Sequence, residues 1–436
     1  MIEAEEVVKK ALGMGADEVA VSIARKRGYR VEVELNDIKS SSYIDTAGVS
    51  ITVIIDKKIA TVSTTLYSLH DLDNVLDEAL RLAKSSERNE KWRSLPEPEK
   101  VPTVEDIYDS RVASFQPEDI VEIVTDAVNH ACSIDERIIV QSGSFETVES
   151  TVEFATSSGH RLEGRSTLVS TYFLAWAKEG SKIGSFSYDE KTSRKLDIDA
   201  RKVSENAAKM ALDSLNSRKI ESFKGTIILD GDALAQIIGT FAQAYKADTV
   251  WKGSSPLKGK IGEKVVSEKL TIIDNGVMPG GVHSFPFDAE GTGRRKTVVV
   301  EKGVLKKYLS NTYTARLLGI EATGNAASLL DVGLTNTYIK PGDSSLEEIL
   351  SNIRKGLLVK RFSGDVRFQD GVVSGVTKQS YYIEDGEIKY PAQEAMISDN
   401  LYSLLAKVAL VGSVVEYRFG IYSPIISFED VNIMVK

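Results

Sequence analysis

Hydrophobic residues recur every three or four positions in several stretches of the chain, a spacing that predicts amphipathic helices. The spacing covers residues 3–21, 69–87, 116–133 and 197–215 in the first half, and residues 345–357 and 400–412 in the second. Gly13 and Gly15 fall where the first helix should end, because glycine readily takes the left-handed conformation that closes a helix. Pro117 falls in the first turn of the third helix, where proline is tolerated.

Alternating polar and apolar residues mark the expected strands between these helices. The alternation covers residues 30–65 and 137–190, and it returns in two expected hairpins at residues 295–310 and 379–391. Short turns at Gly303 and at residues 384–386 separate the paired strands of these hairpins. Because helices and strands are grouped without a regular strand–helix repeat, the pattern predicts an α+β fold rather than a parallel α/β sheet.

The length of 436 residues exceeds what one ordinary hydrophobic core accommodates, so we expect more than one domain. Three of the ten prolines lie within residues 95–102, which predicts an extended connector. A new strand pattern begins at residue 222. We therefore predict an N-terminal mixed α/β domain over residues 1–221, containing this connector, and a C-terminal strand-rich domain over residues 222–436.

Charge and composition narrow the class of protein. The formal net charge is −9 and the pI about 5.3, and the basic clusters at residues 25–27, 293–296 and 355–361 are short and separated. Nucleic-acid-binding domains normally present a basic face, so we expect no direct nucleic-acid partner.

No apolar run approaches the ~18–20 residues that span a membrane. No leader pattern precedes the first helix, and Cys132 is the only cysteine. We therefore expect a cytoplasmic protein without a membrane segment.

Catalytic motifs of fixed spacing are missing from the sequence. The four histidines form no His-Glu-x-x-His pair, and His130 and Cys132 stand two positions apart on an expected helix, where they point to different faces. No Gly-x-Ser-x-Gly nucleophile elbow occurs. Residues 291–295 lack the helix start and the lysine–serine end of a phosphate loop.

Residues 282–303 concentrate unusual chemistry. They include a histidine, carboxylates, glycines and two adjacent arginines before an apolar strand. Loops carry binding and catalytic residues disproportionately, yet Pro286 and the glycines equally fit an irregular turn that feeds a strand. The residues alone leave both interpretations open.

Four stretches together resemble one family. They are residues 286–326, residues 248–276 just before them, residues 15–21 with 62–66, and residues 384–408. They are similar to the TldD/PmbA family, also called modulators of DNA gyrase. The resemblance implies an N-terminal mixed α/β domain and a C-terminal domain built on an antiparallel, barrel-like β-sheet with flanking helices. It also implies a dimer that encloses a cleft.

The resemblance further implies that this chain lacks the family's zinc site. One branch carries zinc on a His-Glu-x-x-x-His helix before the glycine-rich segment at 259–263, with a cysteine near the C-terminus. Here Ile238 and Gln243 replace the two histidines, Gly239 replaces the glutamate, and no cysteine follows Cys132. The chain therefore resembles the PmbA/TldE branch. We expect no catalytic residue and no metal in this chain.

The resemblance assigns the missing chemistry to a partner. It implies a non-catalytic subunit of a heterodimeric metalloprotease, whose TldD-type partner holds the zinc and whose substrates are peptides and unfolded proteins. A homodimer is expected when the partner is absent, because a large exposed pairing surface tends to find a substitute.

The same resemblance names candidates for contact with the peptide cleft or with the partner. They are Phe287, Asp288, Glu290, Gly291, Arg294 and Arg295. Either arginine could hold a carboxylate, from the partner or from Asp288. Adjacent strand residues point to opposite faces, so we expect only one of the two arginines to face the cleft. His283 lies just outside the matching stretch and receives no role.

Two other functions compete with this interpretation. A self-sufficient homodimeric peptidase would use other residues, for example a metal held by His283, Asp288 and Glu290. A non-enzymatic binding protein of the gyrase-modulator type would act through gyrase itself, since the acidic charge disfavours contact with DNA.

Overall fold

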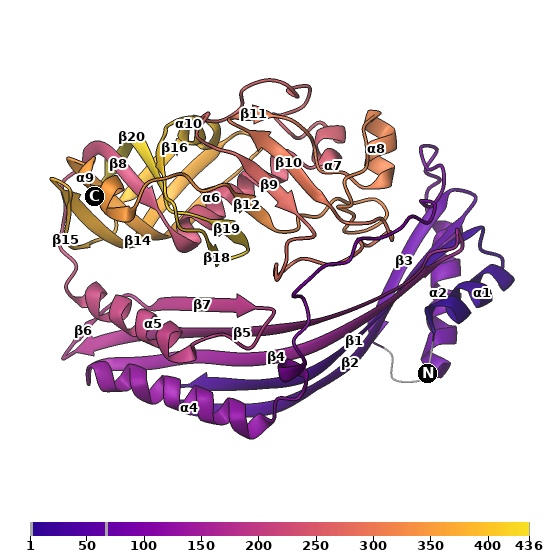
Figure 1. Cartoon of the computed structure of the whole chain (residues 1–436), viewed down its shortest axis with the longest axis horizontal. Helices are drawn as coiled ribbons and strands as arrows, with labels where there is room; N and C mark the ends of the chain where they lie inside the picture. Colours follow the sequence, from indigo (N-terminus) through magenta and orange to yellow (C-terminus); the bar gives the residue numbers. More distant parts are fainter. Residues whose placement is uncertain (1–2, 66–68, 436) are drawn as a thin grey trace.

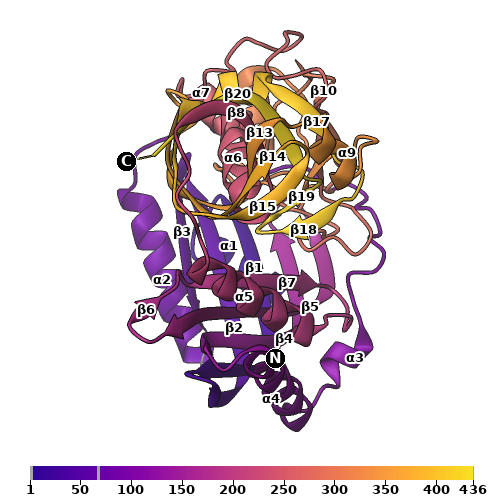
Figure 2. The same ribbon diagram turned by 90° about the vertical axis from the view of Figure 1, so that its left-hand side faces the viewer.

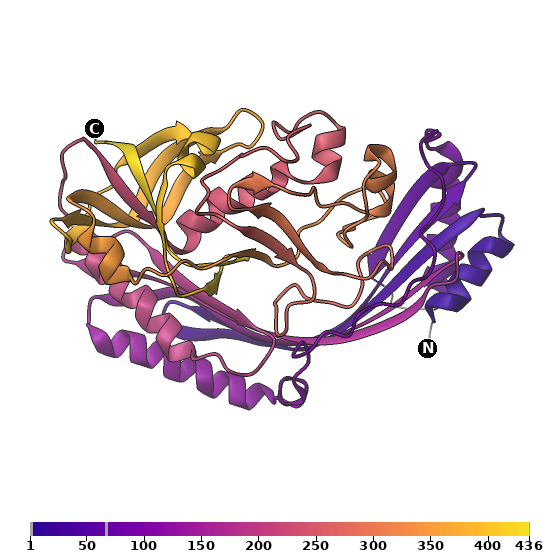
Figure 3. The same ribbon diagram turned by 45° about the horizontal axis from the view of Figure 1, so that its top comes forward.

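The computed structural model describes residues 3–65 and 69–435 of the chain. Its N-terminal half is a long, curved sheet, and its C-terminal half lies along the concave side of that sheet (Figures 1 and 3). The chain crosses from one half to the other between α5 (Ala200–Leu215) and β8 (Phe223–Leu229). Two bodies therefore meet along an extended interface, which is where the predicted site lies.

The sheet of the N-terminal half is antiparallel, and in the described residues it contains seven strands. They are β1 (Glu18–Glu34), β2 (Asp37–Ile55), β3 (Lys58–Thr65), β4 (Ile138–Thr156), β5 (Arg161–Glu179), β6 (Lys182–Ile183) and β7 (Ser187–Ser193). Their order is β3-β2-β1-β4-β5-β6, with β7 also paired to β5. Because four of the strands are 17 to 19 residues long, one sheet is long enough to carry two separate cores.

Helices cover the convex face of the sheet at both of its ends (Figure 1). The helices of this half are α1 (Ala4–Gly13), α2 (Leu69–Ser85), α3 (Ser110–Ala113), α4 (Pro117–Ile134) and α5. On β1, Val21 packs in the core under α1 and α2, whereas Val31 packs in the core under α4 and α5. The two residues are an even number of positions apart, so they share a face of the strand. Ala20 points to the opposite face and contacts the C-terminal half.

The C-terminal half is built on a closed barrel. Within its fully described range the strands of this sheet are β8, β13 (Lys355–Val366), β14 (Val372–Glu384), β15 (Glu387–Ala392), β16 (Met396–Asn400), β17 (Val408–Val411) and β20 (Ile426–Met434). The order β13-β8-β20-β16-β14 closes because β14 also pairs with β13, and β15 and β17 extend the ring. Figure 2 views this barrel from its end. The large core of this half includes α6 (Gly231–Ala244), which contacts β13.

A second sheet leads from the barrel toward the N-terminal half. Its strands are β9 (Ile272–Asn275), β10 (Lys296–Glu301), β11 (Val304–Leu305), β12 (Thr337–Ile339), β18 (Glu416–Arg418) and β19 (Ile421–Ser423), in the order β11-β10-β9-β12-β19-β18. The remaining helices of this half are α7 (Ala247–Trp251), α8 (Thr312–Leu318), α9 (Leu346–Ser351) and α10 (Leu401–Ala406).

The predicted fold class is confirmed, with corrections to two elements. The C-terminal sheets are mainly antiparallel, but β8 pairs with β13, and β12 with β19, in parallel. The helix expected over 345–357 ends at Ser351, because the residues from Lys355 onward pair with β14 and β8. The helix expected over 400–412 ends at Ala406, because the following β17 pairs with β20. No helix in the described part of the chain is long and apolar enough to cross a membrane.

Closure of the barrel depends on two glycines that face each other on β13 and β14. Gly364 and Gly375 are register partners, and a Cβ added to Gly375 would lie 2.5 Å from the Cα of Gly364. We expect Gly375→Ala to lower the free energy of unfolding by about 1–3 kcal/mol, because backbone rather than a flexible side chain blocks the added methyl. Urea denaturation would measure the loss, and an unchanged midpoint would show that the strands separate easily at this point.

Gly239 provides the matched control and a prediction of opposite sign. It lies inside α6, and a Cβ built on it meets no heavy atom within 4 Å. Gly239→Ala should raise the free energy of unfolding by about 0.5–1 kcal/mol, because alanine loses less conformational entropy in a helix. Destabilisation in the same denaturation experiment would mean that an obstacle surrounds this position.

Candidate functional site

Residues 276–295 form a long excursion between the antiparallel strands β9 and β10 and reach the concave face of the N-terminal sheet. Phe285 covers Gly164 on β5, where a Cβ would lie 2.1 Å from the phenyl ring. Phe287 is 4.9 Å from Phe285 and 6.1 Å from Phe154 on β4, measured between ring centroids. We call this excursion the docking loop, because its aromatic rings attach the C-terminal half to the sheet.

Arg194 fixes the docking loop to the N-terminal half. This buried side chain directly follows β7. It donates hydrogen bonds to the carbonyl oxygens of Gly281 at 3.2 Å, Ser284 at 3.1 Å and Thr167 at 3.1 Å. The sequence analysis missed Arg194, since its partners in the loop are 87 and 90 positions away and no local pattern reveals them.

Asp288 organises the tip of the docking loop. Its buried carboxylate accepts hydrogen bonds from the backbone N–H groups of Glu290 and Thr292, both at 3.0 Å, and of Ala326 at 2.9 Å. Burial nevertheless raises the pKa of Asp288, and the backbone hydrogen bonds oppose that rise. The carboxylate therefore acts on the chain itself, as the centre of a turn.

Glu290 attaches the same turn to α8. One of its buried carboxylate oxygens accepts hydrogen bonds from the Thr312 N–H at 2.7 Å, the Thr312 hydroxyl at 2.6 Å and the Thr292 hydroxyl at 3.2 Å. Burial raises the pKa of Glu290, and the negative charge of Asp288 raises it further. Glu290 is thus also engaged inside the chain.

The glycines of the loop permit close approach to the N-terminal half. Gly291 has φ = 84°, and a Cβ on it would lie 2.7 Å from the ring of His160 and 2.7 Å from that of Phe154. The N–H of Gly293 donates a 2.8 Å hydrogen bond to Glu99 of the proline-rich connector. The connector and the hairpin between β4 and β5 therefore hold the loop from two sides.

The side chains of the two adjacent arginines bind different partners, and neither forms a hydrogen bond or an ion pair with Asp288. Arg295 is exposed and forms an ion pair with Glu99 at 3.3 Å. Arg294 is half-buried and donates a 2.6 Å hydrogen bond to the carbonyl oxygen of His283, while its Nε has no partner in the described part of the chain. The carboxylate that pairs with one of these two arginines is that of Glu99, which sequence reasoning did not single out.

The structure does not assemble the metal site of the homodimer hypothesis. The exposed ring of His283 lies 3.3 Å from the Tyr417 hydroxyl, whereas the carboxylates of Asp288 and Glu290 are buried in their own hydrogen bonds. No group of three or more His, Cys, Asp or Glu side chains is placed to hold a metal ion among the residues that the structure describes.

The positions singled out on α6 do not fit a zinc ion. Ile238 is completely buried in the core of the C-terminal half. Gly239 faces open space and offers no side chain, and Gln243 is half-buried. Zinc sites use imidazole, thiolate or carboxylate groups, with a general base beside the metal in hydrolytic sites. These three residues supply none of them.

Comparisons with known proteins give one consistent result. Models of the PmbA/TldA metallopeptidase match in three parts: domain 1 over residues 19–83, the central domain over 110–215 and the C-terminal domain over 222–435. A metalloprotease of Methanothermobacter thermautotrophicus is 33% identical over 69% of this chain and 67% of its own length. A metalloprotease of Methanocaldococcus jannaschii is 30% identical over 86% of this chain and 84% of its own length.

A solved structure extends the likeness to the whole fold. The crystal structure of TldE from Thermococcus kodakarensis superposes with a TM-score of 0.91 at 26% identity, covering 99% of each chain. Its domains are therefore arranged like those described above, from the curved sheet to the barrel.

The buried carboxylate of Glu290 predicts how stability depends on pH. Its folded-state pKa lies above the unfolded value of 4.5, so the folded state binds more protons between the two values. The contribution of Glu290 to stability is therefore full below about pH 4.5 and is lost as the pH rises through the raised folded pKa. Glu290→Gln keeps an acceptor for Thr312 without the charge. We expect the stability of the variant relative to the native chain to improve from about pH 5 to about pH 8.

Melting temperatures across this pH range would measure the effect. Glu268→Gln, at an exposed position, provides the matched control and should give a flat difference. A flat difference for Glu290→Gln as well would mean that the carboxylate is no harder to ionise in the folded chain than in the unfolded chain.

Proposed function

Because this chain belongs to the PmbA/TldD family of metallopeptidases, we propose that it is the zinc-less subunit of a heterodimeric metalloprotease. The zinc-bearing subunit would be a TldD-type chain, and the substrates would be peptides and unfolded proteins. The proposal rests on the three residues of α6 at the positions of the family's zinc motif. Ile238 is buried in the core, Gly239 has no side chain, and Gln243 has an amide in place of an imidazole.

The chemistry of peptide hydrolysis explains why this observation matters. Metal-assisted hydrolysis requires protein ligands around the ion and a base that takes a proton from the attacking water. The candidate carboxylates outside α6, Asp288 and Glu290, are already occupied by backbone and threonine donors. Conversion of these side chains to metal ligands would dismantle the docking loop. In this proposal the metal chemistry therefore belongs to another chain.

In this proposal the chain contributes a rigid frame. The docking loop fixes the barrel against the curved sheet through Arg194, Phe285 and Phe287. Because these contacts fix the two halves relative to each other, their arrangement stays the same when a second subunit binds. No specific observation favours the homodimeric peptidase or the gyrase-binding protein.

The decisive experiment compares hydrolysis of an unfolded protein by this chain alone, by a TldD-type partner alone and by their mixture, with zinc supplied. We expect activity that depends on the mixture and is lost with a chelator, because the zinc ligands lie in the partner and the frame lies here. Replacing the glutamate of the partner's His-Glu-x-x-x-His motif by glutamine should abolish the activity.

A matched variant on this side is Gly239→Ala, which leaves space around α6 and should not change the rate of the mixture. Hydrolysis by this chain alone at a rate comparable to that of the mixture would overturn the proposal.

A further inference from the structure

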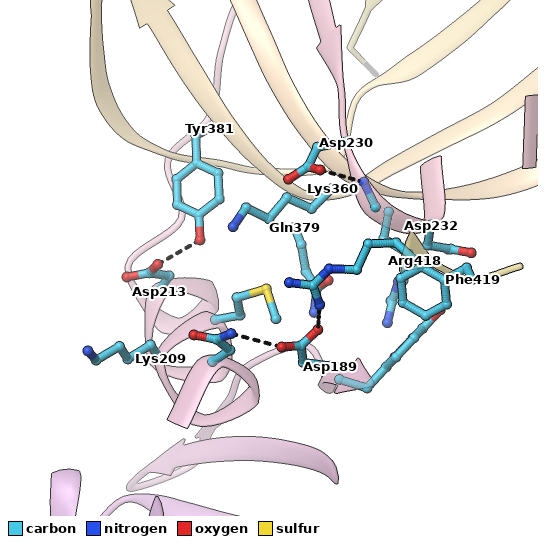
Figure 4. A pocket seen from close by; sticks show the side chains of 15 residues that line it. Asp189, Lys209, Asp213, Asp230, Asp232, Lys360, Gln379, Tyr381, Arg418 and Phe419 are labelled. Atoms are coloured by element: carbon cyan, nitrogen blue, oxygen red, sulfur yellow. Dashed lines mark hydrogen bonds and ion pairs between the residues drawn. The ribbon is translucent and has the colours of Figure 1, made fainter. Parts of the chain in front are cut away.

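A cavity of about 270 Å³ lies between the two halves, away from the docking loop. Its walls come from β7 and α5 on one side, and from β13, β14, the start of α6 and the β18–β19 turn on the other (Figure 4). Lys209 on α5, which is among the lining residues, is exposed to solvent. Neither the sequence motifs nor the proposed function uses the cavity.

The cavity is lined by many charged side chains, with as many acidic as basic residues. Its charged side chains are those of Asp189, Asp213, Asp230, Asp232, Lys209, Lys360, Arg361 and Arg418. Some of these charges are satisfied within the chain. Arg418 pairs with Asp189, which also accepts a 2.8 Å hydrogen bond from Asn206. Arg361 lies over the rings of Phe186 and Tyr188. The remaining charges are the informative ones.

Lys360 is a half-buried cation without an anion. In the described part of the chain no carboxylate oxygen lies within 4.0 Å of its ammonium group, and its recorded contact is the ring of Tyr381 at 6.0 Å. An anionic group of a ligand in the cavity would give this ammonium group the partner that the chain does not supply. Figure 4 shows the side chain of Lys360 extended along the cavity, between Asp230 and Tyr381.

Gln379 adds a second unsatisfied donor on the adjacent strand. Its Nε2 is buried and has no hydrogen-bond partner among the described residues. Its backbone has φ = 49°, an unfavourable conformation for a residue other than glycine. Strands β13 and β14 pair both before and after this point, but Lys360 and Gln379, which would face each other there, are not paired. Strain and an orphaned donor therefore coincide at the cavity wall.

Two carboxylates of the cavity have acceptor capacity to spare. Asp213 accepts one hydrogen bond, from the Tyr381 hydroxyl at 2.7 Å, and Asp230 accepts one from the N–H of Gly231 at 2.7 Å. Among the described residues neither has a cation within 4.0 Å. A carboxylate can accept several hydrogen bonds, so both can receive an ammonium group. The cavity thus offers spare donors and spare acceptors within one small volume.

We propose that this cavity binds a small zwitterion, an amino acid or a dipeptide. The ligand carboxylate lies against Lys360 and the amide of Gln379, and the ligand ammonium lies against Asp213 and Asp230. A simple anion would leave the two aspartates unpaired, and a simple cation would leave Lys360 unpaired. The volume is near the lower limit of known ligand sites, which suits a ligand of this size.

Binding here needs neither a partner chain nor a metal, because every lining residue belongs to this chain. The test is therefore independent of the proposed protease function. Isothermal titration of the isolated chain with L-alanyl-L-alanine should give saturable binding. N-acetyl-alanyl-alanine and alanyl-alanine amide, which each lack one charge, should each bind at least about tenfold more weakly, since each loses a hydrogen bond that involves a charged group.

Lys360→Met keeps the apolar stem and removes the ammonium group, so it should weaken dialanine binding at least about tenfold. Lys340→Met is the matched control, because Lys340 is also an unpaired lysine of the C-terminal half among the described residues but is exposed and outside the cavity. Asp213→Asn keeps an acceptor for the Tyr381 hydroxyl and should weaken binding of dialanine more than binding of its N-acetylated form.

Several results would overturn the proposal. Absence of saturable dialanine binding to the native chain would show that the cavity is not a site for a zwitterion, independently of the results for the variants. Equal binding of dialanine and its N-acetylated form, or equally effective competition by acetate, would show a plain anion site. Equal losses in Lys360→Met and Lys340→Met would show that the cavity is not where the ligand binds. The blocked analogues act on the native chain, so a folding defect in one variant leaves the proposal testable.

Discussion

The arrangement of the two halves depends on one buried guanidinium. Arg194 spans from the end of β7 to the docking loop and satisfies carbonyl oxygens of both halves at once. Its three recorded acceptors are backbone groups, so the contact fixes the path of the loop and not merely the position of a side chain. Loss of a buried charge's partners is expensive. The loop and the sheet are therefore held as a unit, and the aromatic rings of Phe285 and Phe287 fill the space beside that contact.

This constraint changes the meaning of the residues that carry the family resemblance. Asp288, Glu290 and Gly291 have the composition of a reactive loop, but the structure engages them in a turn, a helix start and a close approach to His160. The resemblance in this stretch therefore reflects how the halves are joined.

The sequence predicted the elements whose pattern is local. The long strands of the curved sheet follow from alternation, and the hairpin at Gly303 follows from its turn. The ends of α9 and α10 were wrong because the residues after Ser351 and Ala406 gain partners in distant strands, and such pairing overrides helical periodicity. For the same reason Arg194 could not be found. Its role exists only once strands far apart in the chain lie side by side.

Strand β7 connects the docking loop with the proposed ligand cavity. It carries Asp189, which pairs with Arg418 in the cavity wall, and the chain then continues directly into Arg194 at the loop. The two contacts are five positions apart along the chain, and both join the N-terminal half to the C-terminal half. A ligand that binds only when the halves are docked stabilises the docked form by mass action. Occupancy of the cavity and the rigidity of the frame are thus linked through β7 and the residue that follows it, with no need for contact between the ligand and the docking loop.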